Sequence, residues 1–449
     1  MPASRKINQL PASSKRQFVL DLTELSSHVL SSASKGVPEV LEGVTLEDVP
    51  TRKLNLLRDE FPAPVAVIRE SALRANIELM RQYTESAGVC LAPHGKTTMC
   101  PQLFDLQLDA GAWGMTCATA AHLRVYRRFG VPRVIMANQL LDTDCVRFVA
   151  RELAADSAFD FYGIVDSVAG ARQYHDVLSE LPRGRALNLL LEVGAVGGRT
   201  GVRTFDDALL VARAVADMSG SLRLAGIEAF EGIFPGSPAE AEAGVESLMQ
   251  QVREVARRCD AEQLFGGESV VLTAGGSAHF DQVVKALTSV RLSRPTKVVL
   301  RSGCYITHDH GTYATALDRL RQRSAGSVFA DHGFEPALEL WTTVQSLPEP
   351  GLAIVALGKR DVSFDMGLPV PLKLYRPGSP TALTDLGGKA QIVRLNDHHG
   401  YLKFTGLELA VKDRIAVGIS HPCTTFDRWE YLYRVNEQYD IVSIVRTFF

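Results

Sequence analysis

Residues 187–230 read LNLLLEVGAVGGRTGVRTFDDALLVARAVADMSGSLRLAGIEAF, and this stretch decides the fold class. An apolar run, Leu187–Val193, is followed by a segment of helical period, Asp206–Met218, and by a second apolar run, Leu222–Phe230. Short apolar runs that alternate with helical segments of about 10–15 residues are typical of strand–helix–strand units. The two strands of such a unit are parallel, so the stretch predicts a parallel sheet.

The same rhythm continues on both sides of this unit. Six further apolar runs lie at Val89–Pro93, Trp113–Thr116, Val134–Ala137, Phe159–Val165, Val270–Ala274 and Lys297–Arg301. Segments of helical period lie between them, among them Ala120–Phe129, Val168–Leu178 and Ala239–Arg258. Eight units over roughly 210 residues match the usual size of a (β/α)8 barrel, about 200–250 residues. We therefore predict an α/β fold with a TIM-type barrel, and a doubly wound open sheet is the structural alternative.

The pattern changes after about residue 320, where glycine, proline and β-branched residues replace the long helical segments. Short apolar runs follow at Leu338–Val344, Leu352–Leu357, Gln391–Leu395, Ile415–Ile419 and Asp440–Arg446. This pattern predicts an all-β domain. Near the N-terminus, Phe18–Val29 is a helix candidate. We predict three parts: an extension over 1–60 that packs on the β domain, a barrel over 61–315 and a C-terminal β domain over 316–449.

The composition is that of an ordinary soluble protein, with 46% hydrophobic and 22% charged residues among 449. Lys and Arg number 48 against 51 Asp and Glu, and the net charge of −3 excludes a generic nucleic-acid binder, which would be basic. No apolar run of about 18 residues occurs, so we expect no membrane helix. The seven cysteines are scattered without a CxxC pair, and the first residues lack the apolar core of a secretory signal. Both features favour a cytoplasmic location.

Barrel enzymes carry their active sites at the C-terminal ends of the strands, so the residues that follow each strand are candidates. The first strand leads into Pro93-His94-Gly95-Lys96. A desolvated lysine amine there would be nucleophilic, whereas a surface lysine is the plain alternative. The seventh strand leads into Gly275-Gly276-Ser277, whose N–H groups and hydroxyl suit a phosphate. A tight turn would need the same glycines.

Two further barrel loops carry cationic side chains. After the fifth strand, a glycine-rich loop holds Arg199, which suggests a cation beside a ligand, although the nucleotide patterns GxGxxG and GxxxxGK[ST] are absent. After the eighth strand comes Arg301, which could bind an anion or an aromatic nitrogen, and then His308-Asp309-His310. These two histidines would share a face, and so could hold a metal, only in an extended segment.

In the β domain, His421 and Cys423 follow the apolar run Ile415–Ile419. They point to the same side if the strand continues through them. Imidazole and thiolate are typical zinc ligands, and a pair of them leaves room for water or substrate to complete the shell. A buried thiol beside an unrelated histidine is the alternative.

Taken in order, these motifs resemble the D-serine dehydratase and D-threonine aldolase group of fold-type III pyridoxal-phosphate enzymes, relatives of alanine racemase. The resemblance runs from about Pro62 to Thr425, and Pro-His-x-Lys-Thr and His-x-Cys are its most specific parts. It implies cofactor contacts from His94, Lys96, Arg199, Gly275, Gly276, Ser277, Arg301 and Tyr305.

The resemblance also implies a role for each of these positions. Lys96 would hold pyridoxal 5′-phosphate as a Schiff base, and the Gly275-Gly276-Ser277 segment would bind its phosphate. Arg199 would lie near the phenolic oxygen of the cofactor, with Arg301 and Tyr305 at the mouth of the site. His421 and Cys423 would hold a divalent metal, which ligand softness suggests is Zn²⁺.

The activity implied by the resemblance is that of a lyase for small D-amino acids with a β-hydroxyl. Dehydratases of the group tend to carry His-x-Cys where aldolases carry His-x-Asp, so Cys423 favours conversion of a substrate such as D-serine into a 2-oxo acid and ammonia. D-threonine-aldolase-type cleavage is the alternative, and D-threonine and 3-hydroxyaspartate are further candidate substrates. A racemase that uses Tyr375 or Tyr401 as a second base, and a non-catalytic cofactor-binding protein, are weaker alternatives. The resemblance also implies a homodimer.

Overall fold

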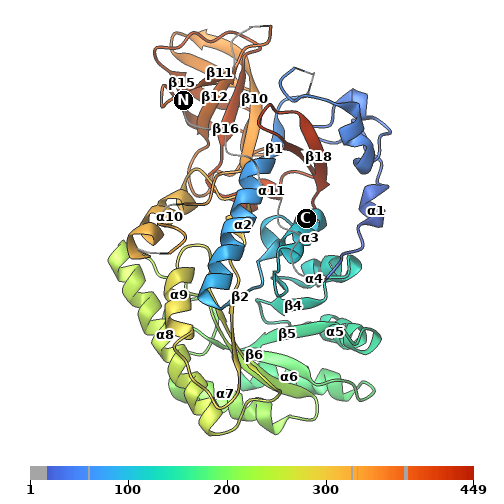
Figure 1. Cartoon of the computed structure of the whole chain (residues 1–449), viewed down its shortest axis with the longest axis vertical. Helices are drawn as coiled ribbons and strands as arrows, with labels where there is room; N and C mark the ends of the chain where they lie inside the picture. Colours follow the sequence, from blue (N-terminus) through green and yellow to red (C-terminus); the bar gives the residue numbers. More distant parts are fainter. Residues whose placement is uncertain (1–17, 59–60, 325–326, 331, 379–382) are drawn as a thin grey trace.

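A computed structural model describes residues 18–58, 61–324, 327–330, 332–378 and 383–449 of the chain (Figure 1). It contains two β-sheets, one of which is surrounded by helices, while the other lies at one end of the molecule together with the N-terminal extension. Within the described ranges, no helix is long and apolar enough to cross a membrane.

The first sheet has eight parallel strands in the order β2-β9-β8-β7-β6-β5-β4-β3. The strands are Cys90–Leu91 (β2), Met115–Cys117 (β3), Arg133–Met136 (β4), Asp160–Val165 (β5), Leu187–Val193 (β6), Leu222–Ala229 (β7), Val270–Ala274 (β8) and Thr296–Leu300 (β9). The two end strands are joined as well, because Trp113 N–H donates to the Leu91 carbonyl (2.7 Å) and Thr116 N–H to the Pro93 carbonyl (2.9 Å). The sheet thus closes on itself, which confirms the predicted barrel and excludes an open doubly wound sheet.

Small and branched side chains form a separate apolar cluster within this sheet. Its buried members are Ala92, Ile135, Leu190, Ala225, Val271 and Val299. Next to it, β7 and β8 approach closely at Gly226, where a Cβ atom would lie 1.8 Å from the carbonyl oxygen of Val271. Only glycine fits there, and the register of the two strands then brings Glu228 beside Thr273 near the end of the barrel.

Helices alternate along the chain with the barrel strands and cover the sheet (Figure 1). They are α2 (Glu70–Ala87), α3 (Pro101–Asp109), α4 (Ala120–Arg128), α5 (Thr143–Ala155), α6 (Val168–Ser179), α7 (Phe205–Asp217), α8 (Pro238–Ala261), α9 (Phe280–Leu287) and α10 (Thr312–Arg323). The side chains of Thr119, Ser167, Thr204 and Ser237 accept backbone N–H groups at the starts of α4, α6, α7 and α8. Such caps define a helix start, and these four helices begin within a residue of the predicted positions.

The second sheet is mainly antiparallel and has the order β13-β12-β16-β10-β1-β17-β18, and β11, β14 and β15 extend it from β10. Its strands are β1 (Val65–Arg69), β10 (Leu338–Glu349), β11 (Leu352–Val355), β12 (Val370–Tyr375), β13 (Thr384–Asp385), β14 (Ala390–Leu395), β15 (Gly400–Phe404), β16 (Arg414–Gly418), β17 (Tyr431–Val435) and β18 (Ile441–Arg446). The C-terminal part of the chain is therefore a β domain, as the sequence predicted.

The structure differs from the predicted boundaries of this domain. β1 belongs to the second sheet, where it pairs antiparallel with β10 and parallel with β17, although its position after residue 61 assigned it to the barrel. A short apolar run before a helix has the same pattern in either sheet, and only its pairing partners distinguish the two. At the other boundary, residue 316 lies within α10, and β10 begins only at Leu338.

The described part of the N-terminal extension lies against the β domain, next to β1 and β18 (Figure 1). Buried Leu30, Leu41 and Val49 share an apolar cluster with Trp341 and Tyr433 of the second sheet. The extension therefore contributes to the core of this domain.

The helix expected over Phe18–Val29 is reduced to one turn, Thr23–Ser26 (α1). Val29 instead forms a β-bridge with Thr45, and Leu30 N–H donates to the Val44 carbonyl at 2.8 Å. Backbone hydrogen bonds of this segment are made with a neighbouring part of the extension instead of within a helix. Sequence periodicity does not reveal such a partner.

Substitution of Leu41 should destabilise the whole fold. Leu41 is 0% exposed, and Leu41→Ala is expected to lower the free energy of unfolding by about 2–5 kcal/mol because it leaves a cavity. Its neighbour Val40 is 56% exposed, so Val40→Ala should change the value by less than about 0.5 kcal/mol. Urea unfolding followed by circular dichroism measures both variants. Equal losses would show that the extension does not pack as described.

Candidate active site

A cavity of about 550 Å³ lies at the C-terminal ends of the barrel strands, with both the barrel and the β domain contributing to its wall. Its lining includes His94, Lys96, Arg199, Gly276, Ser277, Arg301, His421 and Cys423, all of which the sequence predicted as site residues. The volume falls in the range of small-molecule sites, about 300–1,000 Å³. These predicted residues come from five separate segments of the sequence and meet at one site.

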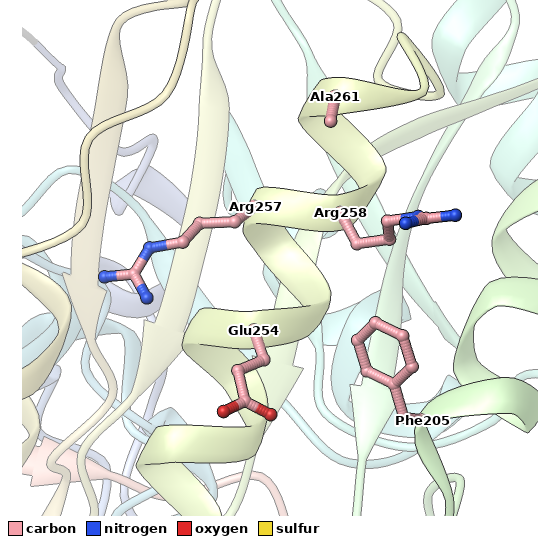
Figure 2. Close-up of a pocket in the computed structure, with 5 residues that line it drawn as sticks. All are labelled: Phe205, Glu254, Arg257, Arg258 and Ala261. Carbon is pink, nitrogen blue, oxygen red and sulfur yellow. The ribbon is translucent and has the colours of Figure 1, made fainter.

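A second depression has a different character. Figure 2 shows it on α8, where Phe205, at the start of α7, lies beside Arg258, while Arg257 extends from the other side of the helix; Glu254 also lines it. Arg258 is paired there with Glu262, at 2.6 Å between Nε and Oε1. The depression contains none of the predicted site residues, so the candidate active site is the cavity at the barrel rim.

Lys96 lies in a one-turn helix, Gly95–Thr97, directly after β2. Its side chain is exposed and lines the cavity, so of the two interpretations of Lys96 the structure agrees with the solvated amine. The neighbouring His94 is different. Burial, followed by the positive charges of Lys96 and Arg301, holds the pKa of His94 well below its usual 6.5. Its ring is therefore neutral, and its buried Nδ1 atom has no hydrogen-bond partner among the described residues.

Arg301 and Glu228 form a buried ion pair at the cavity wall. The guanidinium of Arg301 also donates to the Ala229 carbonyl (2.9 Å) and to Thr273 Oγ1 (3.1 Å). Burial raises the pKa of Glu228 to about 7, although Arg301 opposes this rise. The second carboxyl oxygen of Glu228, Oε2, is buried and has no partner among the described residues. The cavity thus contains a carboxyl group that titrates near neutral pH.

The predicted phosphate loop binds an anionic group, but that group is a side chain of the protein. Gly275 N–H donates to Glu231 Oε2 at 3.0 Å, and Gly276 N–H donates to Glu231 Oε1 at 2.5 Å. Gly275 has a positive φ of 93° and is not part of the cavity lining, whereas Gly276 and Ser277 are. The loop therefore suits an anion, and a phosphate would contact its cavity side at Gly276 and Ser277.

The glycine-rich loop after β6 is held by an arginine that the sequence analysis did not single out. Arg203 donates to the carbonyl oxygens of Gly198 and Arg199 at 3.0 Å each, and to those of Thr200 and Gly201 at 2.6 and 2.7 Å. With its backbone fixed in this way, the loop presents Arg199 at the cavity, where its guanidinium lies 5.0 Å from the centre of the Phe230 ring. The predicted cation beside the ligand site is in place.

Tyr305 does not reach the cavity. It is buried in a one-turn helix, Cys304–Ile306, and its hydroxyl accepts a hydrogen bond from the side-chain amide of Gln107 at 2.9 Å. The resemblance placed Tyr305 at the mouth of the site, but the helical turn after Arg301 directs its ring away from the cavity. Tyr313, at the start of α10, lines the cavity instead.

The His308-Asp309-His310 cluster is part of the helix start rather than a metal site. Asp309 accepts the backbone N–H groups of Gly311 (2.9 Å) and Tyr313 (3.0 Å) at the beginning of α10. Burial lowers the pKa of His308 and of His310 to about 4. In the part of the chain that the structure describes, no three His, Cys, Asp or Glu side chains are arranged to hold a metal ion.

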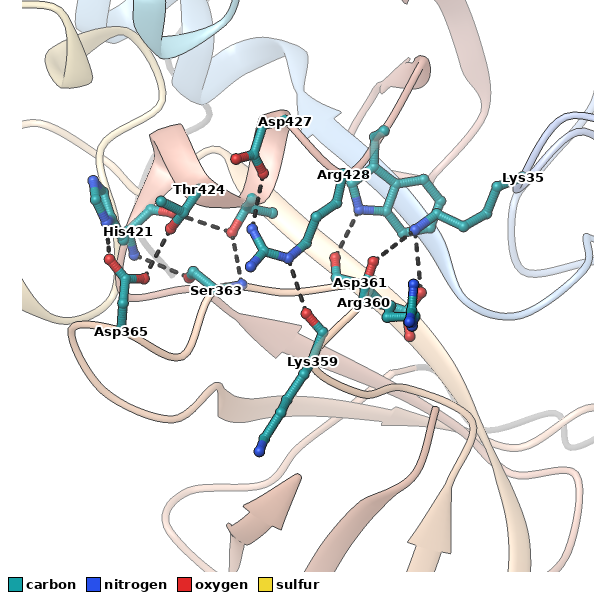
Figure 3. Close-up of polar contacts among 12 residues, drawn as sticks. Lys35, Lys359, Arg360, Asp361, Ser363, Asp365, His421, Thr424, Asp427 and Arg428 are labelled. Carbon is teal, nitrogen blue, oxygen red and sulfur yellow. Dashed lines mark hydrogen bonds and ion pairs between the residues drawn. The ribbon is translucent and has the colours of Figure 1, made fainter. Parts of the chain in front are cut away.

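His421 and Cys423 meet at the cavity, but not on a strand. β16 ends at Gly418, and Pro422 begins the short helix α11 (Pro422–Phe426), because proline suits the first position of a helix. His421 Nδ1 is hydrogen-bonded to Asp365 Oδ2 at 2.6 Å, and Asp365 also accepts from Thr424 at 2.8 Å (Figure 3). A carboxylate behind a ligating imidazole is the usual way to orient it toward a metal, so the pair fits a metal site.

His421 and Cys423 shift each other's pKa. The hydrogen bond from Cys304, followed by that with His421, lowers the pKa of the Cys423 thiol well below its usual value of 9.0. Contact with Cys423, assisted by Asp365 and opposed by burial, raises the pKa of His421 to about 9. Each side chain of this pair thus favours the charged form of the other.

Several residues at the cavity were missed by sequence reasoning. Glu231, Tyr313 and Cys304 line it, and Asp365 contacts it through His421. Glu231 and Cys304 stand beside recognised motifs, so their neighbourhood could have suggested them. Asp365 comes from the loop between β11 and β12, and nothing in its surrounding sequence marks it.

Residues 68–311 match the family model described as "Alanine racemase, N-terminal domain", and residues 337–435 match "Putative serine dehydratase domain". The first match covers more than half of the chain. This chain belongs to the alanine racemase N-terminal domain family. The match confirms the resemblance to fold-type III pyridoxal-phosphate enzymes that the motifs indicated.

The curated relatives of this family member are named aldolases and a dehydratase. The chain is 25% identical over 372 residues to 3-hydroxy-D-aspartate aldolase of Paracoccus denitrificans (strain Pd 1222), covering 81% of this chain and 85% of the relative. It is 26% identical over 345 residues to D-threo-3-hydroxyaspartate dehydratase of Delftia sp. (strain HT23), covering 76% and 83%. The crystal structure of D-threonine aldolase from Filomicrobium marinum shares the fold, with a TM-score of 0.70, 23% identity and coverage of 88% and 97%.

Glu228 should make the stability of the cofactor-free protein depend on pH. Its pKa is higher in the folded chain (about 7) than its ordinary value of 4.5, so its contribution is full below pH 4.5 and is lost as the pH rises through 7. Relative to Glu228→Gln, the wild-type free energy of unfolding should fall by about 3 kcal/mol over this range. Urea unfolding at several pH values measures the difference. Glu254→Gln, on the outer face of α8, is the control, and parallel pH profiles of wild type and Glu228→Gln would contradict the assignment.

Proposed function

We propose that this protein is a pyridoxal-phosphate- and metal-dependent lyase that converts small D-3-hydroxy amino acids, D-serine among them, into 2-oxo acids and ammonia. The observation that carries the proposal is the meeting of Lys96 from the barrel with His421 and Cys423 from the β domain at one cavity. A primary amine can bind a carbonyl cofactor covalently, and imidazole with thiolate can bind a soft divalent metal.

The cavity offers groups suited to an aromatic, anionic cofactor. Two buried polar atoms at its wall, His94 Nδ1 and Glu228 Oε2, have no partner among the described residues, and a ligand could satisfy them. Lys96 would hold the cofactor, and Gly276, Ser277 and Arg199 would contact its oxygens. Pyridoxal phosphate, when bound, withdraws electrons from the substrate Cα and leaves the protein to select which bond breaks.

Side chains of this protein would then remove the Cα proton of the substrate and help its β-hydroxyl to leave. The amine of Lys96 would remove the Cα proton, and its position in the same cavity as the other groups supports this role. His421 and Cys423 would hold the metal, which supplies Lewis acidity to the β-hydroxyl, otherwise a poor leaving group. Loss of the Cα proton and of the β-hydroxyl removes one water. The enamine product takes up water and yields the 2-oxo acid and ammonia.

Aldol cleavage is the second candidate function, and the curated aldolase relative favours it. The same groups would serve, except that the proton is removed from the β-hydroxyl and the Cα–Cβ bond breaks. Cys423 favours the dehydratase, by resemblance to enzymes that carry His-x-Cys at this position. For 3-hydroxyaspartate, the name of the other curated relative shows that dehydration also occurs in this group.

The remaining alternatives find less support. A racemase needs a second base opposite Lys96, but neither Tyr375 nor Tyr401 lines the cavity. Tyr401 instead stacks under Arg394, at 3.7 Å between the guanidinium and the ring centre. A non-catalytic cofactor carrier would not need a metal pair at the site. We also propose that the enzyme is a homodimer of the cytoplasm, on the resemblance and on the scattered free cysteines.

D-Threonine distinguishes the two candidate reactions. The cofactor- and metal-loaded enzyme should convert it into 2-oxobutanoate and ammonia, because elimination retains all four substrate carbons. Chromatography of the products after derivatisation measures this outcome. Lys96→Ala should form neither product. Glycine and acetaldehyde from the wild type would show that the enzyme is an aldolase.

Removal of one metal ligand should separate elimination from cofactor binding. Cys423→Ala is expected to lose at least about 100-fold in elimination rate, since the metal's Lewis acidity supplies several kcal/mol. The visible absorbance of the bound cofactor should remain, because Lys96 is untouched. Cys90→Ala is the control, as Cys90 is half-buried and lines a different cavity. Unchanged elimination by Cys423→Ala would rule out the metal role of this pair.

A further inference from the structure

A second thiol, that of Cys304, lies beside the proposed metal pair of His421 and Cys423. Cys304 follows β9 of the barrel, whereas Cys423 lies in α11 of the β domain, and both line the cavity. Their Sγ atoms are 3.6 Å apart. Thr97, next to Lys96, contacts both thiols, with its Oγ1 atom 3.7 Å from Cys304 and 3.5 Å from Cys423. The two domains thus bring two thiols together at Thr97, the residue that follows Lys96 in the sequence.

The distance between the two sulfur atoms is informative. A disulfide would require about 2.05 Å. Two thiolates on one tetrahedral Zn²⁺, with Zn–S bonds of about 2.3 Å, lie about 3.8 Å apart. The observed 3.6 Å is close to the second value, so an ion could replace the hydrogen bond between the thiols with little movement of either sulfur.

We propose that Cys304 is a third protein ligand of the metal, which would then be held by Cys304, Cys423 and His421. The proposal rests on the proposed function, since it requires the metal at His421 and Cys423. Two thiolates and one imidazole form a known type of catalytic zinc site, in which the fourth position stays open for water or substrate. The open position would receive the β-hydroxyl of the substrate.

The other contacts of the three donors agree with this arrangement. Asp365 occupies Nδ1 of His421, so Nε2 is the nitrogen left for the metal. Cys304 is buried, and its sulfur–oxygen contacts are with the neutral hydroxyls of Thr97 and Tyr313, so no charged side chain is seen to compete for the sulfur in the described structure. In the described structure the three groups do not already surround one point, so a metal would have to draw them together.

Such a site would join the two domains at the cavity. Cys304 belongs to the barrel, and His421 and Cys423 belong to the β domain. A metal bound to all three would fix the position of α11 relative to the loop that carries Lys96. Loss of Cys304 should therefore weaken metal binding and leave the covalent attachment of the cofactor unchanged.

Cobalt substitution counts the thiolate ligands directly. The reduced enzyme with its cofactor is freed of metal by a chelator and titrated with Co²⁺, and the sulfur-to-cobalt charge-transfer absorbance grows with the number of coordinated thiolates. Wild type should show about twice the intensity of Cys304→Ser or of Cys423→Ser. Cys90→Ser should match the wild type. Zn²⁺ affinity of Cys304→Ser should fall at least about 10-fold, in keeping with the loss of a ligand.

Equal charge-transfer intensity in wild type and Cys304→Ser would overturn the proposal. If Cys304→Ser does not fold, X-ray absorption at the zinc edge of the wild type decides, because two sulfur neighbours support the third ligand and one sulfur neighbour overturns it. Failure of the wild type to bind Co²⁺ or Zn²⁺ at all would instead overturn the proposed metal-dependent function. The two failures are therefore distinguishable.

Discussion

The parallel arrangement of the barrel strands is the constraint on which the site depends. Because all eight strands run in the same direction, the ends of β2, β7, β8 and β9 meet at one rim. Lys96, Glu228, Gly276 and Arg301 come from these four ends and line one cavity, although more than 200 residues separate the first from the last. No contact within a single strand or helix could bring them together.

The β domain completes this rim through a connection near the start of the chain. β1 lies in the middle of the second sheet, between β10 and β17, and leads directly into α2 of the barrel. The two domains are therefore linked at both ends of the barrel sequence. With the domains linked in this way, α11 lies over the one-turn helix that carries Lys96. Cys423 in α11 contacts Thr97 in that helix.

The electrostatics of the cavity follow from burial as much as from charge. His94 stays neutral because it is buried near two cations, and Glu228 titrates near neutral pH because burial outweighs its ion pair with Arg301. Across the cavity, the hydrogen bond from Cys304 lowers the pKa of Cys423, and contact with Cys423 raises the pKa of His421. A site that combines a neutral imidazole, a titratable carboxyl and a soft donor pair suits proton transfer together with removal of an oxygen leaving group.

The sequence predicted the barrel, the order of its strands along the chain and a part of the residues that line the cavity. Alternating apolar runs and helical segments report burial on both faces of a parallel strand, and residues after strand ends must lie at the rim. Tertiary structure decided the positions of β1, Tyr305 and Gly275. It also decided the roles of Glu231, Asp365 and Cys304. Each depends on which distant backbone or side chain satisfies a hydrogen bond: β10 and β17 for β1, Gln107 for Tyr305, and Glu231 for the amides of Gly275 and Gly276. Local sequence patterns record burial and periodicity, but they do not record the identity of a partner far away in the chain.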